Sequence, residues 1–149
     1  MTRRYATVVV DGERYGLPVA EVLEVHPPVA LTRLPLAAPA VRGLMNLRGR
    51  IVTVLDLRRC LGLPERDGAA APVNLVLGTA DNPLGLLADQ AGDVIEVDER
   101  ALAPRPAHAS GPGHELIAGV IPLADGLLRT LDVERVRACA AAPERGGSS

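Results

Sequence analysis

Nucleophiles are few and scattered in this sequence. The serines Ser110, Ser148 and Ser149 all fall in segments that are expected to be loop or tail. Cys60 lies on the apolar face of a short expected helix, which favours a buried thiol over a nucleophile. Catalysis needs a nucleophile beside a base, paired carboxylates in a pocket, or a metal cluster. We therefore expect no enzymatic activity and no cofactor.

The best candidates for metal ligands are His108 and His114, which stand on either side of the sequence Ser110-Gly111-Pro112-Gly113. A zinc site would need a third ligand to converge on this pair. Loop histidines are more often solvated than bound to metal, so we expect no metal site. The glycines follow no expected strand and precede no expected helix, which argues against a phosphate-binding loop. A small enzyme that uses Cys60 or the two histidines is the alternative from another functional class.

Charges at the ends of two apolar segments are better candidates for function. Glu24 follows an apolar helical turn, and Arg48 ends an apolar strand. Either the two side chains are separately solvated, or they form an ion pair that fixes the guanidinium at the rim of a binding groove. The residue pattern by itself leaves both interpretations open. The second would make Arg48 a partner-binding residue.

Arg48 lies in the turn of a hairpin that we predict over residues 41–59, with the sequence VRGLMNLRGRIVTVLDLRR. Two β-rich segments, residues 43–47 and 51–55, meet at Arg48-Gly49-Arg50, and a glycine at such a point is typical of a hairpin turn. The second segment is apolar at nearly every position, which predicts a strand buried on both faces. Hairpin stability alone does not require two arginines at the turn. We therefore expect function at this tip.

Part of the hairpin recurs near the end of the sequence. Residues 42–59 align without gaps with residues 118–135, an offset of 76, and five of the 18 pairs are identical. The identical pairs include Asp56 and Asp132, which are each expected to cap the helix that follows. We infer two similar units, each a hairpin that ends in a capped helix. Arg48 aligns with Ala124, so the arginine is not needed merely to build the hairpin.

The string NLRG at residues 46–49, the aliphatic run after it, and LDLR at residues 55–58 resemble the signature of CheW-like domains. Those domains are the coupling adaptors that join chemoreceptors to a histidine kinase. The resemblance extends in order from about Tyr5 to Val136. It implies an all-β protein with short helices, in which two five-stranded barrel-like subdomains of the SH3 or OB type form the CheW-like fold. Thr53 stands where the family often has proline.

The resemblance also implies two partners: the regulatory domain of the chemotaxis histidine kinase, and the helical-hairpin tip of a chemoreceptor. Glu24 and Arg48 match positions that the family uses in coupling, which favours the ion pair. For the apolar residues near them, core packing is the alternative to partner binding. The alternative functions are a divergent adaptor in a motility or developmental pathway and an array component that activates no kinase. The predicted partner-binding residues are Val22, Glu24, Gly43, Leu44, Asn46, Leu47, Arg48, Gly49 and Val73.

Composition supports a packed protein that binds neither nucleic acid nor lipid. The 149 residues are 48% hydrophobic and 23% charged, as in a globular domain. A net charge of -2 and only two aromatic residues, Tyr5 and Tyr15, exclude the usual nucleic-acid-binding surfaces. No apolar run approaches the ~20 residues that span a bilayer, and the first residues do not resemble a signal peptide. We expect a cytoplasmic protein with no membrane insertion, recruited to receptor arrays at the membrane.

Turn signals suggest the layout of one CheW-like domain over residues 1–149. We expect the first subdomain at about residues 14–64, a strand at residues 5–11 at the junction, and the second subdomain at about residues 73–132. Short helices are expected near residues 19–23, 57–61 and 133–141. Residues 98–113 are expected to form a long irregular loop, and residues 143–149 a tail.

Overall fold

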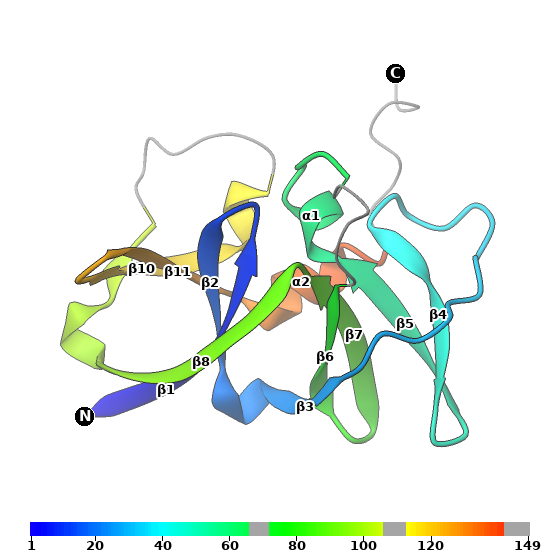
Figure 1. Cartoon of the computed structure of the whole chain (residues 1–149), viewed down its shortest axis with the longest axis horizontal. Helices are drawn as coiled ribbons and strands as arrows, with labels where there is room; N and C mark the ends of the chain where they lie inside the picture. Colours follow the sequence, from blue (N-terminus) through cyan, green and yellow to red (C-terminus); the bar gives the residue numbers. More distant parts are fainter. Residues whose placement is uncertain (66–71, 106–112, 142–149) are drawn as a thin grey trace.

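Strands form most of the described part of the chain, and the helices are short. The computed structural model describes residues 1–65, 72–105 and 113–141. The strands are β1 (Thr2–Val10), β2 (Glu13–Pro18), β3 (Val22–His26), β4 (Val41–Leu47), β5 (Arg50–Asp56), β6 (Val73–Thr79), β7 (Asn82–Ala88), β8 (Gln90–Asp98), β9 (Ala103–Pro104), β10 (Ile117–Leu123) and β11 (Gly126–Leu131). The α-helices are α1 (Leu57–Cys60) and α2 (Val133–Ala138), and the 3-10 helices are η1 (Val19–Glu21), η2 (Glu99–Ala101) and η3 (His114–Leu116). The predicted all-β fold with short helices is confirmed (Figure 1).

The described strands form two sheets, and each sheet contains strands from both halves of the chain. The order is β3-β6-β7-β5-β4 in the five-stranded sheet and β8-β1-β2-β11-β10-β9 in the six-stranded sheet. The hairpin β6–β7 joins the first sheet through parallel pairing of β7 with β5, and the hairpin β1–β2 joins the second through parallel pairing of β2 with β11. Each sheet therefore combines strands from the predicted subdomain at residues 14–64 with strands from the predicted subdomain at residues 73–132.

The predicted internal repeat is confirmed by strand pairing. The hairpins β4–β5 and β10–β11 each have a register shift near the start, just before Gly43 and Gly119, and in each an aspartate stands directly before the following helix. Asp56 accepts a hydrogen bond from a backbone N–H of α1, and Asp132 accepts two from α2, as expected of helix caps. The pairs Val41–Leu55 and Leu47–Arg50 of the first hairpin correspond at the same offset to Ile117–Leu131 and Leu123–Gly126 of the second.

One large apolar core is shared by both sheets and both α-helices. It includes Leu17 of the six-stranded sheet, Leu55 and Leu86 of the five-stranded sheet, and Val136 of α2, each fully buried. Full burial of a leucine side chain contributes about 1.5–3 kcal/mol relative to exposure, so this shared core holds the two sheets together. A second cluster lies on the five-stranded sheet alone and contains Met45, Leu47, Val52, Val54, Val76 and Leu87.

An ion pair also ties the sheets together at their junction. Arg58 of α1 donates two hydrogen bonds to the carboxylate of Asp89, from Nε at 2.9 Å and from Nη2 at 2.7 Å. Asp89 is the single residue between β7 of one sheet and β8 of the other. Its Oδ2 also accepts from the backbone N–H of Asp11, in the turn of β1–β2, at 2.9 Å. The side chains of Arg58 and Asp89 are only 13% and 20% exposed, so this contact is largely shielded from water.

Three expectations about local structure need correction. The helix expected at residues 19–23 is a 3-10 turn that ends at Glu21, because β3 begins at Val22 and pairs with β6. The final helix ends at Ala138 rather than at residue 141. The start of the expected loop is regular: residue 98 ends β8, residues 99–101 form η2, and residues 103–104 form the short strand β9, which pairs with β10. The expected tail and His108 lie outside the described residues.

Candidate partner-binding site

The tip of the hairpin β4–β5 is a tight two-residue turn with an unusual backbone. Arg48 and Gly49 have φ angles of 50° and 86°, the pattern of a type I′ turn, whose twist suits a β-hairpin. The side chain of Asn46 supports the turn by accepting a hydrogen bond from the N–H of Gly49 at 2.9 Å. Glycine and asparagine adopt positive φ easily, but arginine does so at a cost of roughly 1 kcal/mol. An arginine at this position suggests a role for its guanidinium beyond the turn itself.

Glu24 and Arg48 form the ion pair that was one of the two interpretations of the sequence. Nη2 of Arg48 donates to Oε2 of Glu24 at 2.5 Å. Glu24 lies on β3 and Arg48 at the end of β4, and these are the two edge strands of the five-stranded sheet. The sheet therefore curls until its edges approach each other at this point. The Arg48 side chain remains 71% exposed, so the pair contributes at most about 1 kcal/mol to stability.

The second tip arginine, Arg50, has a different environment. Its guanidinium donates to the backbone carbonyl of Ala80 and, at 2.7 Å, to that of Asp81. Both acceptors lie in the turn of the neighbouring hairpin β6–β7. Arg50 thus holds the tip against the sheet, whereas Arg48 projects from it. Both arginines are exposed, but Arg50 binds backbone carbonyls of the sheet whereas Arg48 is held by a carboxylate at its edge.

The remaining predicted residues are divided between the tip and the framework beneath it. Asn46 and Gly49 are exposed beside Arg48, whereas Leu47 is buried in the cluster on the five-stranded sheet and Leu44 is partly buried. Gly43 is buried, and a Cβ there would lie 2.6 Å from the carbonyl oxygen of Thr32. The role of Gly43 visible in the structure is to let residue 32 approach β4.

Val22 and Val73 lie apart from the tip contacts. Both are partly buried and pack against the large shared core. Val22 pairs with Leu77, whereas Val73 pairs with Ala88 and begins β6, at the opposite end of that strand from the turn that Arg50 contacts. The structure therefore does not bring Val73 to the tip.

Exposed aliphatic side chains near the tip were not among the predicted residues. Ile51 is 67% exposed, although its strand was expected to be buried on both faces. It pairs with Asn46 next to the turn, where the hairpin has little of the sheet around it. Leu23 and Val25, on either side of Glu24, are 44% and 56% exposed. Their alternation with Glu24 in a short β-rich segment was the signal that could have revealed them. Exposed aliphatic residues beside charges are typical of protein-binding surfaces.

The structure gives little support to the candidate catalytic and metal-binding residues. In the described ranges, no group of three or more His, Cys, Asp or Glu side chains is placed to hold a metal ion. Cys60 is buried, and its hydrogen bond with the Cys139 thiol, together with burial, raises the pKa of Cys60 well above its ordinary value. A thiol with a raised pKa carries little of the reactive thiolate. Among the described helices, none has the length and hydropathy of a membrane span.

Comparisons with known proteins agree with this geometry. A family model described as CheW-like domain matches residues 4–138. The chemotaxis protein CheW of Bacillus subtilis (strain 168) is 29% identical over 128 residues, which cover 86% of this chain and 82% of that protein. The chemotaxis protein CheW of Helicobacter pylori is 27% identical over 128 residues, covering 86% and 77%. The crystal structure of a scaffolding CheW protein from Thermoanaerobacter tengcongensis has a TM-score of 0.80 at 25% identity, covering 89% of this chain and 90% of that chain. With a family match over nearly the whole chain and the same fold, the chain belongs to the CheW-like domain family of chemotaxis adaptor and scaffold proteins.

Proposed function

We propose that this protein is a non-catalytic adaptor that couples chemoreceptors to a chemotaxis histidine kinase in two-component signal transduction. The relatives that match it are named chemotaxis proteins, and the matching structure is that of a scaffolding protein. The observation that carries the proposal is the exposed guanidinium of Arg48, held by Glu24 on a backbone that glycine or asparagine would adopt more easily. A guanidinium oriented in this way offers N–H donors in a fixed geometry to a carboxylate of a partner.

The contact surface in this proposal is the tip site, which we define as Glu24, Asn46, Arg48 and Gly49. Its partners are the CheW-like regulatory domain of the kinase and the helical-hairpin tip at the cytoplasmic end of a chemoreceptor. Binding to the receptor recruits the protein to membrane-associated arrays. The other predicted residues act through the framework: Gly43, Leu44 and Leu47 shape the hairpin, and Val22 and Val73 pack against the large shared core.

The proposal is tested by removing the guanidinium without disturbing the turn. Asparagine suits the first position of an Asn-Gly type I′ turn, so Arg48→Asn is a cleaner variant than Arg48→Ala. Truncation of a central interface arginine typically costs ~2 kcal/mol or more, which is roughly thirtyfold in affinity. We expect Arg48→Asn to weaken binding to the kinase regulatory domain, to a receptor tip fragment, or to both by that factor. Arg100→Asn is the matched control, because this arginine is 89% exposed on η2.

Glu24 gives a second variant that tests the positioning of Arg48. If Glu24 orients the guanidinium, Glu24→Gln weakens the same interaction, and the double variant loses less than the sum of the two single losses. Titration of each variant against both partner fragments, with thermal melts in parallel, separates binding from stability. Unchanged affinity of a stably folded Arg48→Asn protein for both partners contradicts the proposal. Loss of binding to the receptor fragment alone would identify the tip site as a receptor contact.

A further inference from the structure

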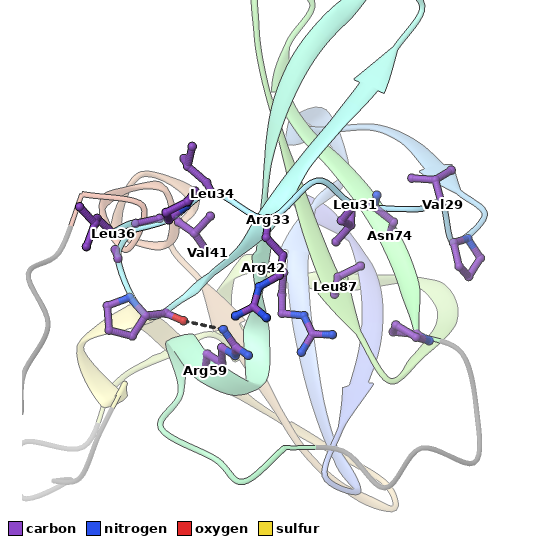
Figure 2. A pocket seen from close by; sticks show the side chains of 16 residues that line it. Val29, Leu31, Arg33, Leu34, Leu36, Val41, Arg42, Arg59, Asn74 and Leu87 are labelled. Atoms are coloured by element: carbon purple, nitrogen blue, oxygen red, sulfur yellow. Dashed lines mark hydrogen bonds between the residues drawn. The ribbon is translucent and has the colours of Figure 1, made fainter.

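A cavity of about 960 Å³ lies between the five-stranded sheet and the proline-rich segment at residues 28–39 (Figure 2). The segment is anchored by Thr32, which exchanges two backbone hydrogen bonds with Leu44 of β4, at 2.9 and 2.8 Å. The lining consists of sixteen described residues, of which three are arginines, one is asparagine and twelve are apolar. None of these sixteen has a carboxylate. The volume is typical of a small-molecule site, and the surface that lines it is about equally polar and apolar.

The three arginines come from separate elements, and their guanidinium groups gather near the centre of the cavity in Figure 2. Arg42 lies on β4 and Arg59 on α1, and both donate to the carboxylate of Glu65, at 3.2 and 2.9 Å. Arg59 also donates to the carbonyl oxygen of Pro39 at 3.0 Å, and Arg42 lies 3.9 Å from the buried carboxylate of Asp56. Glu65 holds these two guanidinium groups without lining the cavity itself. Two cations are thus fixed in place.

Arg33 is the third cation, and within the described ranges its guanidinium has no ion pair or hydrogen bond. In the described part of the chain, the carboxylates of Glu65 and Asp56 contact Arg42 and Arg59. Among the described residues, three positive charges therefore face two negative ones, and the surplus lies at a cavity whose walls are partly apolar. Such walls focus the field of the charges and favour the entry of an anion. A carboxylate is the group that a fork of guanidinium N–H donors matches best.

The exposed leucines of the lining favour a ligand with an aliphatic chain. Leu34 is 46% exposed and Leu36 fully exposed, an unusual state for two leucines in one short segment. Asn74 is completely buried, and its Oδ1 lies 3.0 Å from the position that a Cβ would take at Gly85, so this amide faces β7 and is not open to a ligand in the cavity.

We propose that this cavity binds a small amphipathic carboxylate with an aliphatic chain, such as an N-acyl amino acid. The carboxylate faces Arg33, Arg42 and Arg59, and the acyl chain covers the leucines of the proline-rich segment. The inference is independent of the proposed coupling function, because no residue of the tip site lines the cavity. It assigns to this protein a binding site for a soluble metabolite in addition to its protein partners.

Calorimetric titration of the whole protein with N-octanoylglycine tests the proposal. Two matched compounds separate the parts of the ligand: the methyl ester lacks the charge, and N-acetylglycine lacks the aliphatic chain. We expect both to bind at least about tenfold more weakly than N-octanoylglycine, as loss of a charge-assisted hydrogen bond or of apolar burial predicts. Arg33→Gln should weaken the binding of N-octanoylglycine by a similar factor. Arg4→Gln, at an exposed arginine on β1 of the other sheet, should leave the affinity unchanged.

Three outcomes overturn the proposal. The first is the absence of any measurable binding at millimolar N-octanoylglycine. The second is equal binding of the acid and its methyl ester, which would show that the arginines do not select the charge. The third is equal loss in Arg33→Gln and Arg4→Gln, which would show a non-specific effect of net charge. Arg33 is exposed, so its replacement leaves the fold intact, and a thermal melt of each variant verifies this.

Discussion

Removal of Arg58 is expected to loosen the junction between the two sheets. The Arg58→Ala variant loses two charge-assisted hydrogen bonds to Asp89 and one from Nη1 to the carbonyl oxygen of Pro64 at 3.0 Å. It also leaves the largely buried Asp89 carboxylate without its guanidinium partner. Breaking a fully buried pair costs about 3–5 kcal/mol. Because a fifth of the Asp89 side chain is reached by solvent, we expect a loss of roughly 2–3 kcal/mol.

This loss can be measured by urea unfolding and assigned to the pair by a double-mutant cycle. We expect Arg58→Ala to lower the melting temperature by roughly 5–10 °C for a protein of this size. Asp89→Ala should cost a comparable amount, and the double variant should cost about 1–2 kcal/mol less than the sum of the single losses. The control is the exposed arginine Arg100, which pairs with Asp98 on the surface. Arg100→Ala should have the same melting temperature as the wild-type protein. Additive losses of Arg58→Ala and Asp89→Ala would refute the assigned coupling.

Three further predictions concern the hairpin tip, the glycines and the thiol. Arg48→Asn should leave the free energy of unfolding within about 1 kcal/mol of the wild-type value, because relief of the positive φ offsets the loss of the Glu24 ion pair, and a much larger loss in urea unfolding would contradict the assigned turn. Gly43→Ala should lower the free energy of unfolding by roughly 2–4 kcal/mol, because the new Cβ strains the backbone and overlaps with Thr32. Gly49→Ala has open space around its Cβ position and should cost only about 1 kcal/mol. Equal losses in urea unfolding would show that the contact at Gly43 is unimportant. Cys60 should react with iodoacetamide at pH 8 at least about tenfold more slowly in the folded than in the unfolded protein, because its raised pKa and its burial deplete the thiolate. Rapid reaction of the native protein would instead support the alternative of a cysteine enzyme.

The sequence was informative where structure depends on neighbouring residues. The turns at Asp11-Gly12 and Arg48-Gly49 follow from glycine in a short loop between β-rich segments, and both have the positive φ angles that such turns require. The aspartates that end the two hairpins were recognisable as helix caps because capping is a local hydrogen bond. The repeat was visible because its apolar positions and caps recur at one fixed offset.

The same reasoning could not predict which strands distant in the sequence pair with each other. Nothing in the apolar pattern of β7 or β2 shows that each pairs in parallel with a strand from the other half of the chain, because any apolar partner satisfies that pattern equally. The helix expected at residues 19–23 was cut short for this reason, since pairing with β6 takes Val22 into a strand. The alignment of Arg48 with Ala124 was similarly limited, because among non-glycine residues of the described chain only Asp11, Leu36 and Arg48 have positive φ. The two turns differ in type although their flanking strands correspond.

The interleaving of the two sheets has a consequence for how the chain reaches this structure. The first hairpin, β1–β2, is complete by residue 18, but its partner β11 spans residues 126–131, so more than half of the sequence separates the two. Chains with such distant contacts fold slowly, because the entropy of closing the long loop is lost before the pairing compensates for it. During synthesis on the ribosome, β2 must wait with one edge open until β11 emerges, and an open strand edge is a template for pairing with other molecules. The neighbouring hairpin β6–β7 meets its partner β5 after only a short stretch of chain, so the five-stranded sheet is expected to form first and to serve as the surface on which the six-stranded sheet is completed.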